Sequence, residues 1–127
     1  MANRGHQDLC VWQAAMAFVE RVDIVTSTCP TDERFGFTAQ VRRAADAVPS
    51  NIAEGRGQGS DAEFVRHCSI AYGTSMEVAT QLKLARWLGF LNEVDAGEPG
   101  NLTGEVGCML NARRSSLADA RRPTPGG

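Results

Sequence analysis

Arginine is the residue type in this chain whose placement could do chemistry. Twelve of the 13 basic residues are arginine, and a guanidinium group binds phosphate through two parallel hydrogen bonds. Six arginines are candidate nucleic-acid contacts that could line one surface: Arg42, Arg43, Arg56, Arg66, Arg113 and Arg114. The alternative is that these side chains form a solvated surface with salt bridges between subunits.

The charges are separated along the chain although their sum is only -2. Residues 92–106 carry four carboxylates and no basic residue, whereas residues 107–127 carry four arginines and one aspartate. In a ring of identical subunits this polarity would give one basic and one acidic face. A net charge so close to zero argues against binding a polyanion by bulk charge alone, so any nucleic acid would have to meet local arginine clusters.

Three further polar residues are predicted to form a structural network, namely Asn51, Glu54 and Glu77. Asn51 and Glu54 flank the apolar position Ile52 near the end of a predicted helix. A polar network that joins these residues to Arg43 would fix the second helix against the third. Buried polar networks of this kind specify geometry more than they add stability. The alternative is a partner site at a subunit edge.

The sequence predicts neither an enzyme nor a metal or cofactor site. The only histidines are His6 and His67, and a di-iron helical bundle needs two Glu-x-x-His motifs with further carboxylates. Residues 55–60 are glycine-rich and precede a predicted helix, but the strand and the lysine of a nucleotide-binding loop are absent. A nucleic-acid phosphate docked at this loop with the help of Arg56 stays open as an alternative.

The cysteine spacing and the hydropathy pattern indicate a cytoplasmic protein without a membrane span. The four cysteines lie far apart and form no CxxC pair, which is typical of buried free thiols in a reducing compartment. No run of about 18 apolar residues occurs, and residues 1–8 are polar, unlike the apolar core of a signal peptide.

The elements that must position these residues are helices, because apolar residues recur every three or four positions almost throughout. The first predicted helix, about residues 9–28, carries two apolar stripes and therefore needs two sets of neighbours. The second, about residues 37–55, contains Pro49, which predicts a kink rather than an end. The third predicted helix begins at a Ser60–Glu63 capping box and ends at Gly89.

The fourth helix is predicted to begin raggedly, or after a loop, because residues 92–106 contain Gly97, Pro99 and Gly100. Four helices with short connections predict an all-α, antiparallel up-down-up-down four-helix bundle. The expected domain organisation is a flexible N-terminus at residues 1–7, the bundle at residues 8–120 and a disordered tail at residues 121–127.

Several short strings in the chain carry a resemblance to a known family. They are Asp8-Leu9-x-Val11-Trp12, Pro49-Ser50-Asn51-Ile52-Ala53-Glu54-Gly55 and Ile70-Ala71-x-Gly73-x-Ser75-x-Glu77. Over about residues 8–117 the chain resembles the four-helix-bundle family first noticed as proteins encoded in intervening sequences of bacterial 23S ribosomal RNA genes. The resemblance implies a homopentamer without enzymatic activity. It also implies kinship with the accessory variability determinant of diversity-generating retroelements, which binds RNA and a reverse transcriptase.

The residues and the resemblance together predict a non-catalytic oligomeric accessory protein that binds RNA or DNA through its arginine clusters, with a reverse transcriptase as a candidate partner. The alternative is a structural or scaffolding oligomer that binds a protein and no nucleic acid. The extra apolar stripe of the first helix favours this alternative, because an exposed stripe promotes association.

Overall fold

The computed structural model describes the backbone of residues 2–121 and, within it, the side chains of residues 5–32, 36–92, 104–117 and 119. Four long helices make up this part of the chain: α1 (Ala2–Thr26), α2 (Ala39–Gly57), α3 (Asp61–Trp87) and α4 (Glu93–Arg121). A 3-10 turn (Thr31–Glu33) and a π-helical turn (Arg34–Thr38) join α1 to α2. Residues 2–121 contain no strand, so the prediction of an all-helical protein is confirmed.

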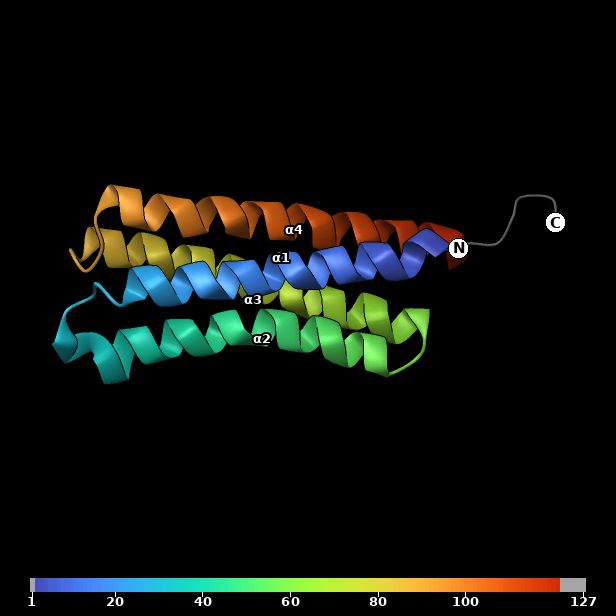
Figure 1. Ribbon diagram of the computed structural model, residues 1–127, viewed down its shortest axis with the longest axis horizontal. Coiled ribbons are helices and arrows are strands. Elements are labelled where there is room, and N and C mark those ends of the chain that lie inside the picture. Colours follow the sequence, from blue (N-terminus) through green and yellow to red (C-terminus); the bar gives the residue numbers. More distant parts are fainter. Residues whose placement is uncertain (1, 122–127) are drawn as a thin grey trace.

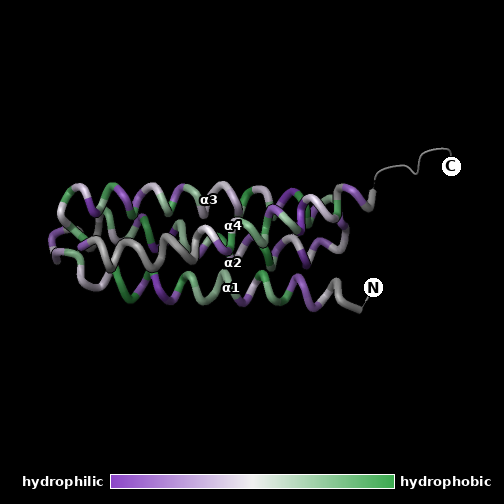
Figure 2. The backbone as a smooth tube through the Cα atoms, turned by 90° about the horizontal axis from the view of Figure 1, so that it is seen from above, coloured by the Kyte–Doolittle hydropathy of each residue, from purple (hydrophilic) through white to green (hydrophobic). Residues whose placement is uncertain are grey.

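The helices form a closed ring in which α1 packs on α2, α2 on α3, α3 on α4 and α4 on α1. The connections alternate between the two ends of the bundle (Figure 1). We call the end where α1 begins, α2 ends, α3 begins and α4 ends the Asp8 end, and the opposite end the Arg42 end. α1 and α3 face each other across the ring, and they lie on opposite sides of the bundle in Figure 2.

The core consists of inward-facing residues at three- and four-residue spacing in every helix. The apolar residues that recur every three or four positions in α3 are buried, from Phe64 to Ala85. Ser75 is buried with them, and its hydroxyl donates a hydrogen bond to the Tyr72 carbonyl at 2.7 Å. The largest fully buried side chains are Phe18, Ile52, Leu82 and Leu110, one from each helix. Each helix therefore contributes its own stripe to a single core, as helix packing in a bundle requires.

Both predicted ends of α3 are confirmed. The Ser60 hydroxyl accepts a hydrogen bond from the Glu63 backbone N–H at 3.2 Å and caps the helix. At the other end Gly89 has a φ of +81°. The Phe90 N–H donates to the Ala85 carbonyl at 2.8 Å and the Gly89 N–H to the Arg86 carbonyl at 3.1 Å. This pair of bonds is the Schellman motif, which needs the left-handed conformation that glycine adopts without strain.

α1 and α4 begin earlier than the sequence predicted. α1 begins at Ala2 rather than after a flexible segment of residues 1–7, and α4 begins at Glu93 in spite of the glycines and the proline in residues 92–106. α2 runs through Pro49 without ending, as predicted. Packing on neighbouring helices outweighs a low intrinsic helix propensity, which amounts to about 1 kcal/mol for each glycine. Of the predicted tail at residues 121–127, Arg121 ends α4, and residues 122–127 lie outside the described residues.

No helix in the described part of the chain combines the length and the apolar character that a bilayer span requires.

Candidate nucleic-acid interface

The six candidate arginines form two groups in the protomer rather than one surface. Arg42 and Arg43 lie near the start of α2 at the Arg42 end. The other four belong to the Asp8 end, where α2 finishes, α3 starts and the second half of α4 lies: Arg56, Arg66, Arg113 and Arg114. The 14 residues of α2 between Arg42 and Arg56 rise about 21 Å along the helix axis. A single phosphate could not bridge the two groups.

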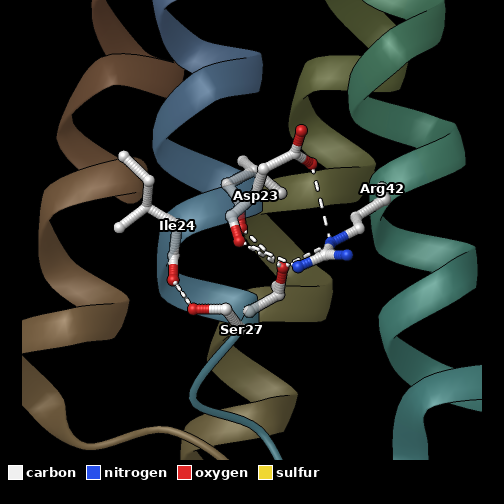
Figure 3. A network of polar contacts seen from close by, with 6 residues as sticks. Asp23, Ile24, Ser27 and Arg42 are labelled. Atoms are coloured by element: carbon white, nitrogen blue, oxygen red, sulfur yellow. Dashed lines mark hydrogen bonds and ion pairs between the residues drawn. The ribbon is translucent and has the colours of Figure 1, made fainter.

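Arg42 fastens the start of α2 to the end of α1 (Figure 3). Its Nε donates a hydrogen bond to Thr26 Oγ1 at 2.9 Å, and its Nη2 donates to the Asp23 carbonyl oxygen at 2.9 Å. The same Nε lies 3.6 Å from Asp23 Oδ1. Arg42 is therefore engaged within the protomer. Its neighbour Arg43 is exposed and forms no ion pair or hydrogen bond with any side chain that the structure describes.

The carboxylates around Arg42 outnumber the guanidinium group. The pKa of Asp46 is raised above its ordinary value of 3.8, first because the carboxyl is partly buried and second because Asp23 lies nearby, while Arg42 partly offsets both effects. A phosphate that approached Arg42 would therefore meet the carboxylates of Asp23 and Asp46. The neighbouring Arg43 is open to solvent.

Asp8 is the centre of the other group. Its side chain is only 3% exposed, and it binds an arginine from each of two other helices. Asp8 Oδ1 accepts a hydrogen bond from Arg113 Nε at 2.9 Å, and Asp8 Oδ2 lies 3.3 Å from Arg56 Nη1. Arg113 also donates from Nη1 to Gln7 Oε1 at 2.8 Å. Asp8 therefore ties α1 to α2 and α4, and the buried Arg113 is a structural residue in the protomer.

Arg114 and Arg66 differ in how far they are engaged. Arg114 donates hydrogen bonds to Ser69 Oγ at 3.2 Å and to Asn111 Oδ1, and its guanidinium carbon lies 5.5 Å from the centre of the Tyr72 ring. The contacts with Ser69 and Tyr72 hold α4 on α3, whereas the contact with Asn111 lies within α4. Arg66 pairs only within α3, where its Nη2 lies 3.0 Å from Glu63 Oε2, and its side chain is 58% exposed. Arg66 is therefore accessible to a ligand, whereas Arg114 is a helix contact.

Of the three residues in the predicted polar network, only Asn51 joins two helices. Its Oδ1 lies 3.3 Å from Nδ1 of His67, which is buried, and its Nδ2 donates to the Ala47 carbonyl at 2.9 Å. Glu54 is exposed at the end of α2, and Glu77 meets Gln81 on its own helix. The expected partner Arg43 is not involved, so the network differs in its members from the prediction.

Gly55 explains why His67 takes this place. A Cβ atom at Gly55 would lie 2.7 Å from the Cβ of His67, closer than such atoms approach, so glycine is needed for α3 to pack this tightly against α2. The close approach brings the imidazole beside Asn51. The sequence analysis predicted a structural role for neither His67 nor Asp8. A signal for Asp8 exists, because it stands three residues before Val11 and seven before Ala15 on the buried stripe of α1.

The Asp8 end also contains a cavity and a buried cysteine. A cavity of about 230 Å³ is lined by Asp8, Gly55, Arg56, Gly59, Ser60, Asp61, Phe64 and Leu117. Close to Asp8, the pKa of the Cys68 thiol is raised to about 11, first by burial and second by the Asp8 charge. A thiol with this pKa is protonated at neutral pH and is a poor nucleophile. Within the described side chains no group of three metal-ligating residues occurs.

The arrangement leaves three of the six guanidinium groups accessible to a phosphate. They are Arg43, Arg56 and Arg66, and the side chains of the last two are 55% and 58% exposed. Arg42, Arg113 and Arg114 are engaged in contacts between helices. Arg56 and Arg66 share the Asp8 end, which makes this end the better candidate for binding nucleic acid.

Comparison with known proteins gives one family and one fold. A family model described as 23S rRNA-intervening sequence protein matches residues 7–112. No curated protein matches. A solved structure with the same fold is the crystal structure of a protein with unknown function from the S23 ribosomal protein family of Bacteroides thetaiotaomicron VPI-5482. It is similar to this chain with a TM-score of 0.78 and 19% sequence identity, over 86% of this chain and 98% of that chain.

Proposed function

The chain belongs to the 23S rRNA-intervening sequence protein family, and from this premise we propose that it is a non-catalytic homo-oligomer that binds nucleic acid. In this proposal the protomer is an antiparallel up-down-up-down bundle, and five protomers form a pentamer, as the family resemblance implies. Exposed arginine side chains bind the phosphates of RNA or DNA, and a reverse transcriptase is a candidate partner.

The observation that carries the proposal is the exposure of Arg56 and Arg66 at one end of the bundle. Each is paired with one carboxylate, Asp8 or Glu63, but more than half of each arginine side chain is open to solvent. The exposed Arg66–Glu63 pair contributes at most about 1 kcal/mol, so a phosphate can compete for the Arg66 guanidinium group. Arg56 pairs with the buried Asp8, but more than half of its own side chain is open to a phosphate. In a ring these arginines would recur at every protomer, and several weak phosphate contacts would add up by multivalency.

The test is the affinity for a fluorescent single-stranded RNA or DNA of about 30 nucleotides, measured by anisotropy as the salt concentration is raised. The affinity should fall linearly on a logarithmic scale with salt, because phosphate contacts release counterions. The double variant Arg56→Gln/Arg66→Gln should lose about tenfold or more in affinity. Binding that does not change with salt, or that the double variant retains, would rule out this site.

The matched control is Arg42→Gln compared with Arg66→Gln. Each variant removes one positive charge, but the Arg42 guanidinium already contacts Thr26 and Asp23. The structure therefore leads us to expect that Arg66→Gln weakens binding and that Arg42→Gln stays within about twofold of the wild type. Equal losses in the two variants would indicate a general effect of charge rather than a site at the Asp8 end.

A second candidate function is a scaffolding oligomer that binds a protein partner and no nucleic acid. The observation that favours it is a group of large apolar side chains on the surface, of which Trp87 is 71% and Leu88 is 65% exposed. Apolar residues exposed together mark protein interaction sites. An oligomer that binds neither RNA nor DNA, even at low salt, would favour this function over the first.

A further inference from the structure

Gly73 is a glycine that the protomer does not explain. It lies in the middle of α3, where glycine lowers the helix equilibrium about fivefold relative to alanine. A Cβ atom at Gly73 would meet no atom within 4 Å. By contrast, a Cβ at Gly55 would lie 2.7 Å from His67 Cβ, and one at Gly107 would lie 3.3 Å from Tyr72 Cε2. Nothing within the protomer therefore requires a glycine at position 73.

The outward face of α3 carries exposed apolar side chains on both sides of the exposed Glu77. Ile70 is 40% exposed, Leu84 is 43% exposed and Leu88 is 65% exposed. Together with Gly73 these residues recur at a helical spacing, on the side of α3 opposite its buried stripe. We call this set of four residues the α3 strip. It combines one small residue, which allows a close approach of another helix, with three large apolar residues, and the exposed Glu77 lies between Gly73 and Leu84.

A second apolar strip lies on α1. Leu9 is 49% exposed and Met16 is 44% exposed, and the half-buried Trp12 and Val19 lie between and beyond them at steps of three and four residues. We call these four residues the α1 strip. Trp12, Met16 and Val19 line a shallow hollow on the outer surface of α1. This is one of the two stripes that the sequence analysis found on the first helix, and no helix of the protomer covers it fully.

We infer that the α1 strip of one protomer packs on the α3 strip of the next copy of the chain, with Gly73 at the point of closest approach. This inference rests on the proposed homo-oligomer and names its contact surfaces. α1 and α3 lie on opposite sides of the bundle (Figure 2). Two different strips make a head-to-tail contact, which uses both strips of every protomer and generates a ring when the rotation between neighbours closes.

The charges beside the two strips complement each other, which argues for a second copy as the occupant. Glu20 follows the α1 strip and Lys83 lies beside the end of the α3 strip, and both are exposed. Neither forms an ion pair or hydrogen bond with a residue whose side chain is described. Both helices run toward the Arg42 end (Figure 1). Protomers aligned side by side therefore bring the carboxylate end of one strip toward the lysine end of the other.

The first experiment uses sedimentation velocity at 1–100 µM on the full chain and two glycine variants. Gly73→Gln adds a side chain that the protomer accommodates but that holds a neighbouring helix away. Gly104→Gln is the matched control, because Gly104 is also an exposed glycine in a helix with nothing within 4 Å of a Cβ. We expect Gly73→Gln to weaken assembly at least tenfold with its helical circular dichroism intact, whereas Gly104→Gln assembles as the wild type does.

The outcomes separate this inference from the proposed function. A wild type that is monomeric at 100 µM would overturn both the homo-oligomer and this contact. An oligomeric wild type whose assembly Gly73→Gln leaves unchanged would overturn the contact and leave the homo-oligomer standing. Equal dissociation of Gly73→Gln and Gly104→Gln would also overturn the contact, because Gly104 lies outside both strips.

A complementation experiment tests the head-to-tail arrangement. Met16→Glu places a charge in the α1 strip and should also prevent assembly. A mixture of Met16→Glu and Gly73→Gln protomers contains one intact α3 strip and one intact α1 strip. The mixture should form a 1:1 heterodimer, whereas each variant alone stays monomeric. A mixture that remains monomeric would overturn the pairing of α1 with α3.

Discussion

At each end of the bundle an aspartate–arginine pair holds α1 against a neighbouring helix, α4 at the Asp8 end and α2 at the Arg42 end, and the two pairs lie in different environments. At the Asp8 end the carboxylate is 3% exposed and its partner Arg113 is 10% exposed. At the Arg42 end Asp23 is 50% exposed and Arg42 is 39% exposed. Removing one partner of a buried ion pair costs about 3–5 kcal/mol, whereas an exposed pair contributes at most about 1 kcal/mol. Burial, rather than residue type, decides which pair the fold depends on.

The largest expected effect is the loss of stability in Asp8→Asn. The amide cannot neutralise Arg113, which would be left charged and buried, so we expect unfolding to become easier by about 3 kcal/mol. This corresponds to a fall in Tm of about 10 °C for a domain of this size. Urea denaturation at a fixed protein concentration measures it.

The matched control for this prediction is Asp23→Asn at the Arg42 end. It removes the same charge, but Arg42 keeps its hydrogen bonds to Thr26 and to the Asp23 backbone carbonyl. We expect a loss below about 1 kcal/mol. If the two variants lose equal stability, the contrast between the two ends does not hold.

The next largest expected effect is slow alkylation of the Cys68 thiol. Burial raises its pKa, and the buried charge of Asp8 raises it further. With a pKa of about 11, the Cys68 thiol should react with iodoacetamide at pH 8 at least about 100-fold more slowly than the exposed Cys108. Mass-spectrometric mapping of the alkylated cysteines gives both rates in one sample. The difference should disappear in denaturant. A Cys68 that reacts as fast as Cys108 in the folded protein would contradict the buried environment of this end.

The smallest expected effect concerns Asp46 at the Arg42 end. Because its folded-state pKa is raised, folding favours the protonated carboxyl, and stability is lost as the pH rises through that pKa. Asp46→Asn should therefore give a small increase in Tm at pH 7. The gain should vanish below pH 3.8, the ordinary pKa, where the wild type is itself protonated.

The control for Asp46→Asn is Asp32→Asn, which removes another exposed carboxylate, one that forms no ion pair with a described side chain. It should leave Tm nearly unchanged at both pH values. A gain at pH 7 that is equal in both variants would reflect net charge and not the burial of Asp46 and its repulsion by Asp23.

Much of the fold could be predicted because its signals are local. The period of the apolar residues predicted the helices and the buried stripe of α3, and Ser60 and Gly89 predicted its ends. The start of α4 could not be predicted in this way. Glycine and proline lower the local helix propensity there, whereas α4 as a whole packs on α3 and α1, which lie far away in the sequence.

The candidate site was less predictable than the fold, because the role of each arginine depends on distant partners. Arg113 was predicted to bind phosphate, yet it pairs with Asp8, 105 residues away. Arg42 was also predicted to bind phosphate, yet it donates a hydrogen bond to Thr26. Arg66 lies on a helix surface with a partner only on its own helix, so its exposure followed from the helical period alone.

The sequence by itself determined the helices, the core stripes and the family, because these depend on spacing along the chain and on short strings such as residues 49–55. Only the tertiary structure decided which arginines are engaged and which are exposed, and which apolar stripe lies inside. The physical reason is that an ion pair or a buried face needs two helices at a given distance. That distance depends on details such as the missing Cβ of Gly55 beside His67, which no local pattern encodes.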